Sequence, residues 1–522
     1  DPPLPSDAVE SLVSYHLGPI LDVALAGAGH WTAIDRMRHV GSLRGAIEIS
    51  GARVGPRLEE IMSVLHRGVR DDDDDSEIYG VFFSCGEAVG RYVGIHEPLG
   101  VVLPRLDGTA PGPSGGPRDL CAWFVLLSAL VLGASAGEVG ESMPRICHSI
   151  RLAASREDCA SNQAAAETLL DACGDLLHAA APALAAREGE GAPPSAQADM
   201  IRCLIRLLGC PEAFGVGAGT ADLLVEMAPG GDVPALLRPN FPRLLSVSAA
   251  NLPADGGAPA DFCAFDALVR AAGIVSREEF GAILPILEER LRPNVTPRAA
   301  LTALGTLAHV LGGVDGAALQ PFAARILAGP CLVPRLAWAA GEAASAVRKA
   351  ATACLLTLIG GGAASMDDLG EAAPSLAPAL GTALGDHDGS CRHLACACLA
   401  TLLAGAPPGT VGSEGFSRMY PDVLARLDDP LDVVRIAACD VMEVLLSHAV
   451  APEDSRGTAL GYITDRFLVH ADDGDAGVRA ACVGVLAVAI RVDNRGAVQK
   501  RIGAALGSLC NPGPCEALLK IN

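Results

Sequence analysis

Two glycine-containing stretches match patterns that support catalysis or nucleotide binding in other proteins. Residues 112–116, GPSGG, fit the G-x-S-x-G pattern of a serine nucleophile, which needs a strand before it and a helix directly after it. This stretch lies inside a loop rich in proline and glycine, so we assign it no catalytic role. Residues 215–219, GVGAG, lack the spacing and the preceding strand of a dinucleotide-binding turn, and we expect a linker there.

Histidines and cysteines gather over twelve residues at His387, Cys391, His393, Cys396 and Cys398. Their residue types suggest zinc, but three cysteines on different sides of one helix do not converge on a tetrahedral ion. Walker A, H-E-x-x-H, EF-hand and C-x-x-C motifs do not occur in the sequence. We therefore expect no catalytic residue, no metal and no cofactor, and we predict that the chain is not an enzyme.

The sharpest pattern is a ladder of charged residues. Its arginines are separated by 44, 43 and 44 residues, and an acidic residue stands six positions before each of them. The four pairs are Glu342 and Arg348, Asp386 and Arg392, Asp429 and Arg435, and Asp473 and Arg479. Because an active site needs only one copy, the repetition favours a structural role. The acidic residue can cap the following helix, and the arginine can reach an aspartate of its own or the neighbouring turn. That these residues also line a partner surface stays open.

Each arginine of the ladder opens an apolar run. The apolar residues recur three, seven, ten and eleven positions after the arginine, which places them on one helix face. Small residues occupy the position three after the arginine, where they allow neighbouring helices to approach closely. We expect the core of this region to contain Leu355, Leu358, Leu399, Leu402, Met442, Leu445, Leu486 and Ile490.

A second apolar segment precedes each run, for example at residues 373–386 and 419–429. Two helices in about 44 residues are typical of HEAT and armadillo repeats, which bury their apolar faces by stacking. We therefore predict an all-α fold, a HEAT/armadillo-type α-solenoid of stacked helical hairpins. Residues 1–260 should form a degenerate helical-repeat half with Gly/Pro-rich loops, and residues 261–522 the HEAT-repeat half. We expect the two halves to form one continuous solenoid.

The overall composition limits the possible partners. The chain has 522 residues, is 50% hydrophobic and only 4% aromatic, and carries a formal net charge of −22. Helices tolerate this composition better than β-sandwiches do. No cluster of lysine and arginine occurs along the sequence, so we expect neither nucleic acid nor an anionic membrane as a partner. The acidic run at residues 71–75 is most simply a solvated turn, with a bound cation or basic peptide as the alternative.

The number and the distribution of the cysteines indicate the cellular compartment of the protein. There are 17 of them, an odd number, scattered through apolar helical patterns. Such a distribution is typical of reduced core thiols in a cytoplasmic protein, whereas a secreted disulfide scaffold is shorter and denser in cysteine. No signal peptide opens the chain and no long uninterrupted apolar run crosses it. The sequence begins at Asp1 rather than Met, and we expect it to be part of a longer protein.

Several stretches resemble one known family. The stronger similarity lies at residues 325–359, 418–446 and 515–520, and a weaker one at 30–51, 88–106 and 265–293. In this order they resemble the C-terminal part of the dynein axonemal assembly factor 5 family, a HEAT-repeat family whose earlier repeats are missing here. The acidic run at residues 71–75 and the longer Gly/Pro loops depart from the family pattern and inherit no role.

The resemblance implies a non-catalytic cytoplasmic scaffold. It would support preassembly of outer and inner axonemal dynein arms before their delivery to motile cilia. The implied partners are axonemal dynein subunits, the dynein intermediate chain above all, together with other dynein assembly factors and chaperones. The alternative is a tubulin-binding or other HEAT-repeat interaction scaffold. Acidic turns such as Asp428 and Asp472 oppose docking on the acidic surface of tubulin.

Overall fold

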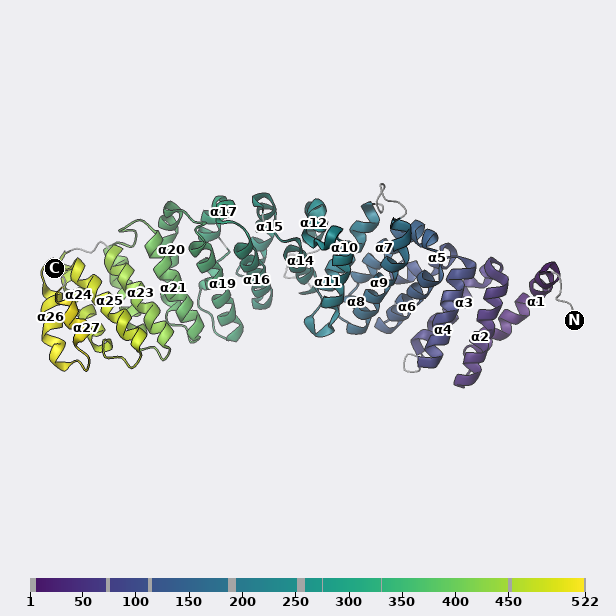
Figure 1. Cartoon of the computed structure of the whole chain (residues 1–522), viewed down its shortest axis with the longest axis horizontal. Helices are drawn as coiled ribbons and strands as arrows, with labels where there is room; N and C mark the ends of the chain where they lie inside the picture. Colours follow the sequence, from purple (N-terminus) through teal and green to yellow (C-terminus); the bar gives the residue numbers. More distant parts are fainter. Residues whose placement is uncertain are drawn as a thin grey trace. The chain divides into compact units, whose positions relative to one another are not determined.

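The computed structural model describes most of the chain, and every regular element in that part is helical (Figure 1). The described residues are 6–71, 76–110, 115–185, 194–250, 259–274, 276–329, 331–448 and 453–520. The serine of the GPSGG stretch and four of the five aspartates of the acidic run lie outside them. The predicted all-α solenoid class is confirmed by the helical hairpins described below.

Contacts between helices divide the chain into two units. The last helix of the first unit is α14 (Pro259–Ala272), which packs against α10 (Pro194–Leu208), α12 (Val233–Leu237) and α13 (Phe241–Ala250). The boundary between the units therefore follows Ala272, whereas the sequence suggested a division at residue 260. Continuity of the two halves as a single solenoid stays a prediction.

The first unit contains fourteen α-helices among its described residues. Besides α10, α12, α13 and α14, they are α1 (Ser6–Gly27), α2 (Ala33–Ser50), α3 (Leu58–Asp71), α4 (Ser76–Ala88), α5 (His96–Leu106), α6 (Pro117–Gly133), α7 (Ala136–Ala154), α8 (Glu157–Ala160), α9 (Gln163–Ala185) and α11 (Val216–Met227). Its short helical turns are η1 (Gly51–Arg57), η2 (Val89–Val93), η3 (Glu212–Phe214), η4 (Pro229–Gly231) and η5 (Arg238–Asn240).

The second unit contains thirteen α-helices among its described residues. They are α15 (Arg277–Arg290), α16 (Pro297–Gly313), α17 (Gly316–Ala328), α18 (Val333–Leu336), α19 (Glu342–Gly360), α20 (Met366–Ala383), α21 (Gly389–Gly405), α22 (Gly412–Leu424), α23 (Asp432–His448), α24 (Glu453–His470), α25 (Ala476–Val492), α26 (Ala497–Ala505) and α27 (Gly513–Leu518). The turns η6 (Ala425–Asp428) and η7 (Leu506–Ser508) complete it.

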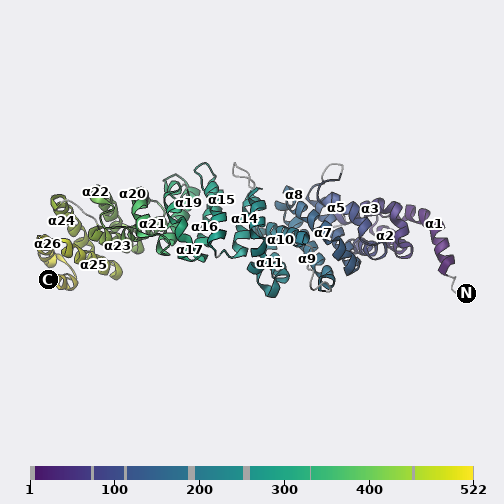
Figure 2. The same ribbon diagram turned by 90° about the horizontal axis from the view of Figure 1, so that it is seen from above.

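Two layers of helices build the second unit (Figures 1 and 2). In one layer α16, α19, α21, α23 and α25 each contact the next. In the other layer α17, α20, α22, α24 and α26 do the same, and the hairpin pairs α20–α21, α22–α23 and α24–α25 join the layers. Each hairpin thus buries its apolar face against its neighbours as well as internally, which is how a solenoid is stabilised.

The first unit has the same two-layer construction with less regular spacing. Helices α2, α4, α6, α9 and α11 follow one another in one layer, and α3, α5, α7, α10 and α14 in the other. Local sequence starts several helices firmly. In α7, for example, the Ser135 side chain accepts from the Glu138 N–H, and the Glu138 carboxylate accepts from the Ser135 N–H. Such a reciprocal capping box satisfies two N–H groups that the helix leaves unpaired.

The apolar runs after the ladder arginines fill the space between the layers of the second unit. All but one of the core residues named from the sequence are at most 1% exposed; they are Leu355, Leu358, Leu399, Leu402, Met442, Leu445 and Leu486. Ile490 is half-buried, and Ala489 beside it is fully buried instead. The small residues Ala351, Ala395, Ala438 and Cys482 are fully buried where adjacent helices meet.

Helix α19 is long and apolar enough to cross a membrane by length and composition alone. In the structure it packs between α16 and α21, and half of its apolar stretch is buried inside the unit. It also buries the guanidinium of Arg348. The apolar character of α19 is therefore explained by its central place in the helical stack.

Candidate functional site

The charged ladder forms a chain of contacts from one hairpin to the next in the second unit. Arg348 on α19 donates through Nε to Asp386, over a distance of 2.6 Å. Arg392 on α21 holds both carboxylate oxygens of Asp429, at 2.6 Å and 2.9 Å. Arg435 on α23 donates to Asp473 at 3.1 Å. These three arginines thus each reach the aspartate of the following turn, and Arg435 also pairs with Asp432 at the start of its own helix.

Each ladder arginine also binds its own turn through a backbone carbonyl. Arg392, Arg435 and Arg479 donate through Nη1 to the carbonyl oxygen of the acidic residue six positions earlier, over 2.8, 2.8 and 2.7 Å. One guanidinium therefore ties the turn of its own hairpin to the turn of the next. Such a link fixes the stacking of neighbouring repeats as well as the geometry of each turn.

The ladder aspartates brace their turns, and other residues cap the helices. The side chain of Asp386 accepts from the Asp388 N–H at 3.0 Å, and Asp388 in turn accepts from the N–H groups of Ser390 and Cys391 as the N-cap of α21. Asp475 caps α25 in the same way, while Asp473 accepts from its N–H. Our expectation that the ladder aspartate itself is the cap was wrong. The ladder aspartate lies two residues before the N-cap, where its short side chain reaches the N–H of the N-cap residue itself.

The two ends of the ladder differ from its centre. Glu342 is exposed in the first turn of α19, and Arg348 donates to the carbonyl oxygen of Ala339 instead. At the other end, Arg479 donates to the carbonyl oxygens of Asp473 and Gly474, and no described carboxylate from a later turn pairs with it. The complete links are therefore the three central ones.

The first two links are buried. The side chains of Arg348 and Asp386 are 2% and 1% exposed, and that of Asp429 is 1% exposed. Burial raises the pKa of Asp386 and Asp429. The hydrogen bonds from Arg348 and Arg392 respectively, those from backbone N–H groups and the nearby positive charges outweigh this, so each pKa lies below its usual range. Both aspartates are therefore held as carboxylates.

The last link opens onto an acidic pocket of about 630 Å³ at the surface. Its carboxylates come from the turn before α23 and the turn before α25, and they are Asp428, Asp429, Asp432, Asp473 and Asp475. Asp428 and Asp432 have exposed side chains, 62% and 55% accessible, and they pair with Arg466 and Arg435 respectively. Arg435 and His470 also line the pocket. Burial lowers the pKa of His470, with Asp428 acting in the opposite direction, so the histidine adds little charge at neutral pH.

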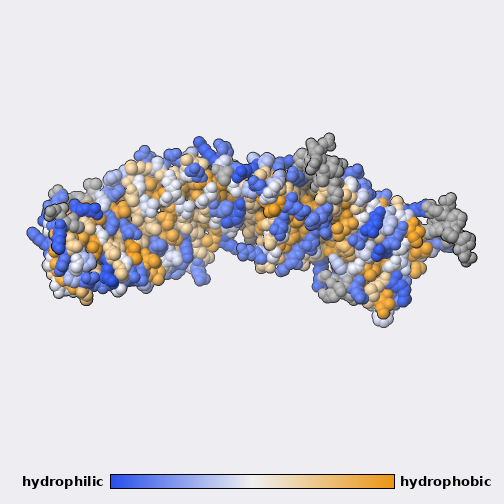
Figure 3. All heavy atoms as spheres, viewed as in Figure 1, coloured by the Kyte–Doolittle hydropathy of each residue, from blue (hydrophilic) through white to orange (hydrophobic). Residues whose placement is uncertain are grey.

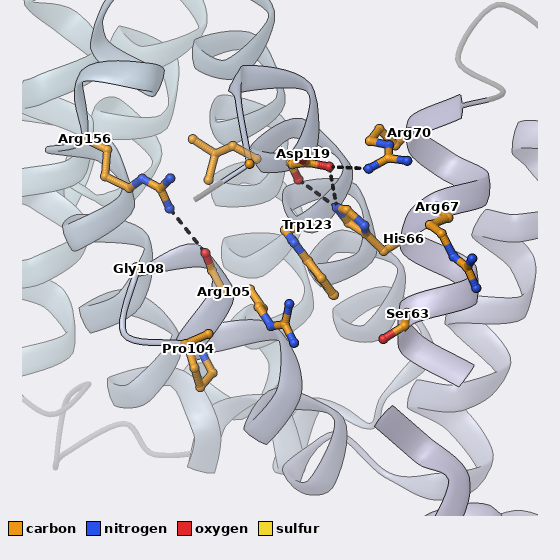
Figure 4. Close-up of a pocket in the computed structure, with 13 residues that line it drawn as sticks. Ser63, His66, Arg67, Arg70, Pro104, Arg105, Gly108, Asp119, Trp123 and Arg156 are labelled. Carbon is orange, nitrogen blue, oxygen red and sulfur yellow. Dashed lines mark hydrogen bonds and ion pairs between the residues drawn. The ribbon is translucent and has the colours of Figure 1, made fainter. Parts of the chain in front are cut away.

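A second pocket, in the first unit, was not found from the sequence. Four arginines line its volume of about 490 Å³ together with His66, Asp119 and Trp123 (Figure 4). Arg67 and Arg70 come from α3, Arg105 from α5, and Arg156 from the turn before α8. Because residues 67 and 156 are far apart in the chain, a search for a run of basic residues does not find the cluster. Only the packing of three hairpins brings it together.

Known proteins share features with this chain. No protein-family model matches it. A mouse protein, dynein axonemal assembly factor 5, is 22% identical over 500 residues, which cover 92% of this chain and 55% of that protein. Its human counterpart is 24% identical over 296 residues, covering 55% and 34% of the two chains. The chain resembles dynein axonemal assembly factor 5. It spans about half the length of the mouse protein.

Among solved structures, the alignment with Kap121p bound to Nup53p covers 95% of this chain and 47% of the Kap121p chain, at 13% identity and a TM-score of 0.43.

The surface of the present chain that Figure 3 shows is a mosaic of hydrophilic and hydrophobic residues over both units. Two exposed aromatic side chains of the described part, Trp31 and Trp338, are 85% and 62% accessible. The acidic pocket and the basic pocket are distinguished from this mixed surface by the charged side chains that line them.

Proposed function

We propose that the chain is a non-catalytic scaffold in the cytoplasmic preassembly of axonemal dynein arms, which are then delivered to motile cilia. The observation that carries this proposal is the similarity to dynein axonemal assembly factor 5 along 92% of the chain. An assembly scaffold needs an extended surface of stacked helices, and helical repeats supply one. The function of the whole protein is proposed here for a chain that spans about half of the mouse relative.

Two features support the assignment to a binding protein of the cytoplasm. The most regular charged constellation in the chain, the ladder, has its arginines and aspartates engaged with one another and with turn carbonyls. Such a constellation stabilises a stack of repeats and leaves no nucleophile or general base poised for a substrate. All 17 cysteines are free, and most are buried, which suits a reducing compartment.

The client surface that we propose is the acidic pocket. Asp428 and Asp432 present exposed carboxylates, each paired with one arginine of the chain, and the chain as a whole carries a net charge of −22. Electrostatic complementarity then favours a basic segment of the client, and dynein intermediate chain is the subunit that we propose. Tubulin, whose surface is acidic, is disfavoured for the same reason.

Purified components test this directly. The chain would be mixed with purified dynein intermediate chain, and the dissociation constant measured at low and at moderate salt. The variant Asp428→Asn/Asp432→Asn removes two charges from the pocket while it keeps side-chain size. Two rim charges of about 0.5–1 kcal/mol each predict roughly five- to thirtyfold weaker binding. The control Glu371→Gln/Glu414→Gln removes two exposed charges from α20 and α22, outside the pocket.

The outcomes test the proposed partner and the proposed binding site separately. Binding that weakens in the pocket variant and not in the control supports both. Binding that is equal in all three proteins keeps the intermediate chain as a partner and refutes the pocket as its site. Absence of intermediate-chain binding together with saturable binding of tubulin would overturn the proposed function.

A further inference from the structure

The basic pocket of the first unit stands out in a strongly acidic chain. Four arginines are distributed around one pocket, and Asp119 is the only carboxylate among its lining residues (Figure 4). Clusters of this kind cost free energy through mutual repulsion unless anions compensate them. Which of the four charges the protein already compensates therefore decides what the pocket can bind.

Two of the arginines have structural partners. Arg156 donates to the carbonyl oxygens of Arg105 and Leu106 at the end of α5, and it pairs with Asp158 at 3.1 Å. Cations at such a position satisfy the last carbonyls of a helix. Arg70 pairs with Asp71 at 2.7 Å and with Asp119 at 3.0 Å. These two guanidiniums shape the pocket and are already neutralised.

The other two arginines are far less engaged. Arg67 is exposed, and it makes no hydrogen bond or ion pair with any residue that the structure describes. Arg105 has Glu59 at 3.9 Å, which is beyond hydrogen-bond distance, and its guanidinium lies 5.9 Å from the centre of the Trp123 ring. Arg67 and Arg105 are therefore the two pocket arginines without a hydrogen-bonded carboxylate among the described residues, with Asp71 and Glu59 as their more distant counter-charges.

Trp123 gives this pair of cations a rigid floor. Its ring stacks on His66 with the centres 4.1 Å apart and an angle of 17° between the planes, and it also supports Arg105. His66 is fixed by the carbonyl oxygen of Asp119, 3.1 Å from its Nε2. Because the indole is already covered by these side chains, the pocket offers charge rather than a free ring for a nucleobase to stack on.

The size and the surroundings of the pocket select a short anionic group on a protein segment. A cavity of about 490 Å³ holds one or a few side chains. A long polyanion such as nucleic acid would meet the carboxylates of Asp71, Asp158 and Glu59 at the rim, as well as the net charge of −22. A single phosphate or carboxylate cluster avoids most of that repulsion.

We propose that Arg67 and Arg105 bind the anionic side chain of a partner protein segment, either a phosphorylated serine or threonine or a short run of acidic residues. Guanidinium groups bind phosphate and carboxylate oxygens through paired hydrogen bonds, and a phosphate adds close to two negative charges to the segment. This inference is independent of the dynein assignment, because it rests only on the charges and partners within the first unit.

A binding measurement on the intact chain tests the proposal. The probes are a fluorescent glycine- and serine-rich peptide with one central phosphoserine, the same peptide without the phosphate, and a version with three central glutamates. Fluorescence anisotropy should show saturable binding of at least one anionic peptide below about 1 mM, and none of the neutral peptide. The two anionic probes identify which source of negative charge the pocket prefers.

Two single variants locate the site. Arg67→Gln and Arg105→Gln should each weaken binding of the anionic peptide about tenfold, since each loses one charge-assisted contact. Arg38→Gln is the matched control, because Arg38 is 71% exposed on α2 and does not line the pocket. Far-UV circular dichroism of all four proteins checks that the helices remain.

Three results would overturn the proposal. The first is that neither anionic peptide binds saturably. The second is that both pocket variants bind as tightly as the control. The third is that inorganic phosphate alone binds with the affinity of the phosphopeptide, because the pocket would then recognise a free ion and not a protein segment.

Discussion

Arg392 is the arginine whose loss should reveal what the ladder contributes. It holds both oxygens of Asp429, and the Asp429 side chain is only 1% exposed. In Arg392→Ala this carboxylate keeps the Leu431 N–H at 3.1 Å and the more distant Arg426 at 3.5 Å. Breaking a buried pair from one side costs about 3–5 kcal/mol. Because these two partners remain, we expect Arg392→Ala to lose about 3 kcal/mol of stability, the lower end of that range.

Hydrogen exchange is the appropriate assay, because a stack of repeats need not unfold in one step. We expect amides in the centres of α21 and α23 to lose about 3 kcal/mol of protection in Arg392→Ala. In Arg418→Ala, which breaks an ion pair with side chains 65% and 86% exposed, the loss should stay below about 1 kcal/mol. The double variant Arg392→Ala/Asp429→Ala should recover part of the protection, since it removes the stranded charge.

A stabilising role of the Arg392–Asp429 pair is refuted if Arg392→Ala loses no more protection than Arg418→Ala. The same role is refuted if the losses of protection from Arg392→Ala and Asp429→Ala simply add in the double variant, because two residues that act as a pair should not be additive. Either result would mean that apolar packing alone stabilises the contacts between hairpins and that the ladder contributes nothing measurable to them.

Three further changes probe the same stack. Leu445→Pro breaks the helical hydrogen bonding of α23 and should cost about 3 kcal/mol or more, seen as a lower midpoint of thermal unfolding; an unchanged midpoint would contradict the helix. Ala438→Leu should cost about 1–3 kcal/mol in urea unfolding, because Ala438 is fully buried between helices, and a neutral effect would refute close approach there. The lowered pKa of Asp429 stabilises the folded state at neutral pH, and this stability should fall as pH drops below about 4. Asp429→Asn should show a shallower acid-induced loss, and an unchanged slope would contradict the assignment.

The sequence predicts the second unit well because its repeats are regular. Leu399 and Met442 lie at equivalent places after the arginines, and a helical period converts that spacing into one buried face. Which carboxylate each ladder arginine contacts could not be predicted from the sequence. Arg392 has an aspartate six positions before it and another in the next turn, and only the rise from one hairpin to the next decides which carboxylate it meets.

The basic pocket shows what sequence reasoning misses. Arg67 and Arg105 lie on different hairpins, and each on its own resembles an ordinary solvated arginine. That they line one pocket depends on how α3, α5 and α6 pack in the first unit, whose repeats are too irregular to align. Compositional counts were also misleading, because a chain with a net charge of −22 gives no hint of a local cluster of positive charge.

One measurement tests most directly whether this chain is the scaffold for dynein assembly that we propose. The tagged chain would be crosslinked in the cytoplasm of cells that are building motile cilia, and the crosslinked residues identified by mass spectrometry. We predict that axonemal dynein chains, with the intermediate chain foremost, crosslink to the helices and turns between residues 373 and 490. Recovery of tubulin or of a phosphatase on those residues, without dynein chains, would contradict the account.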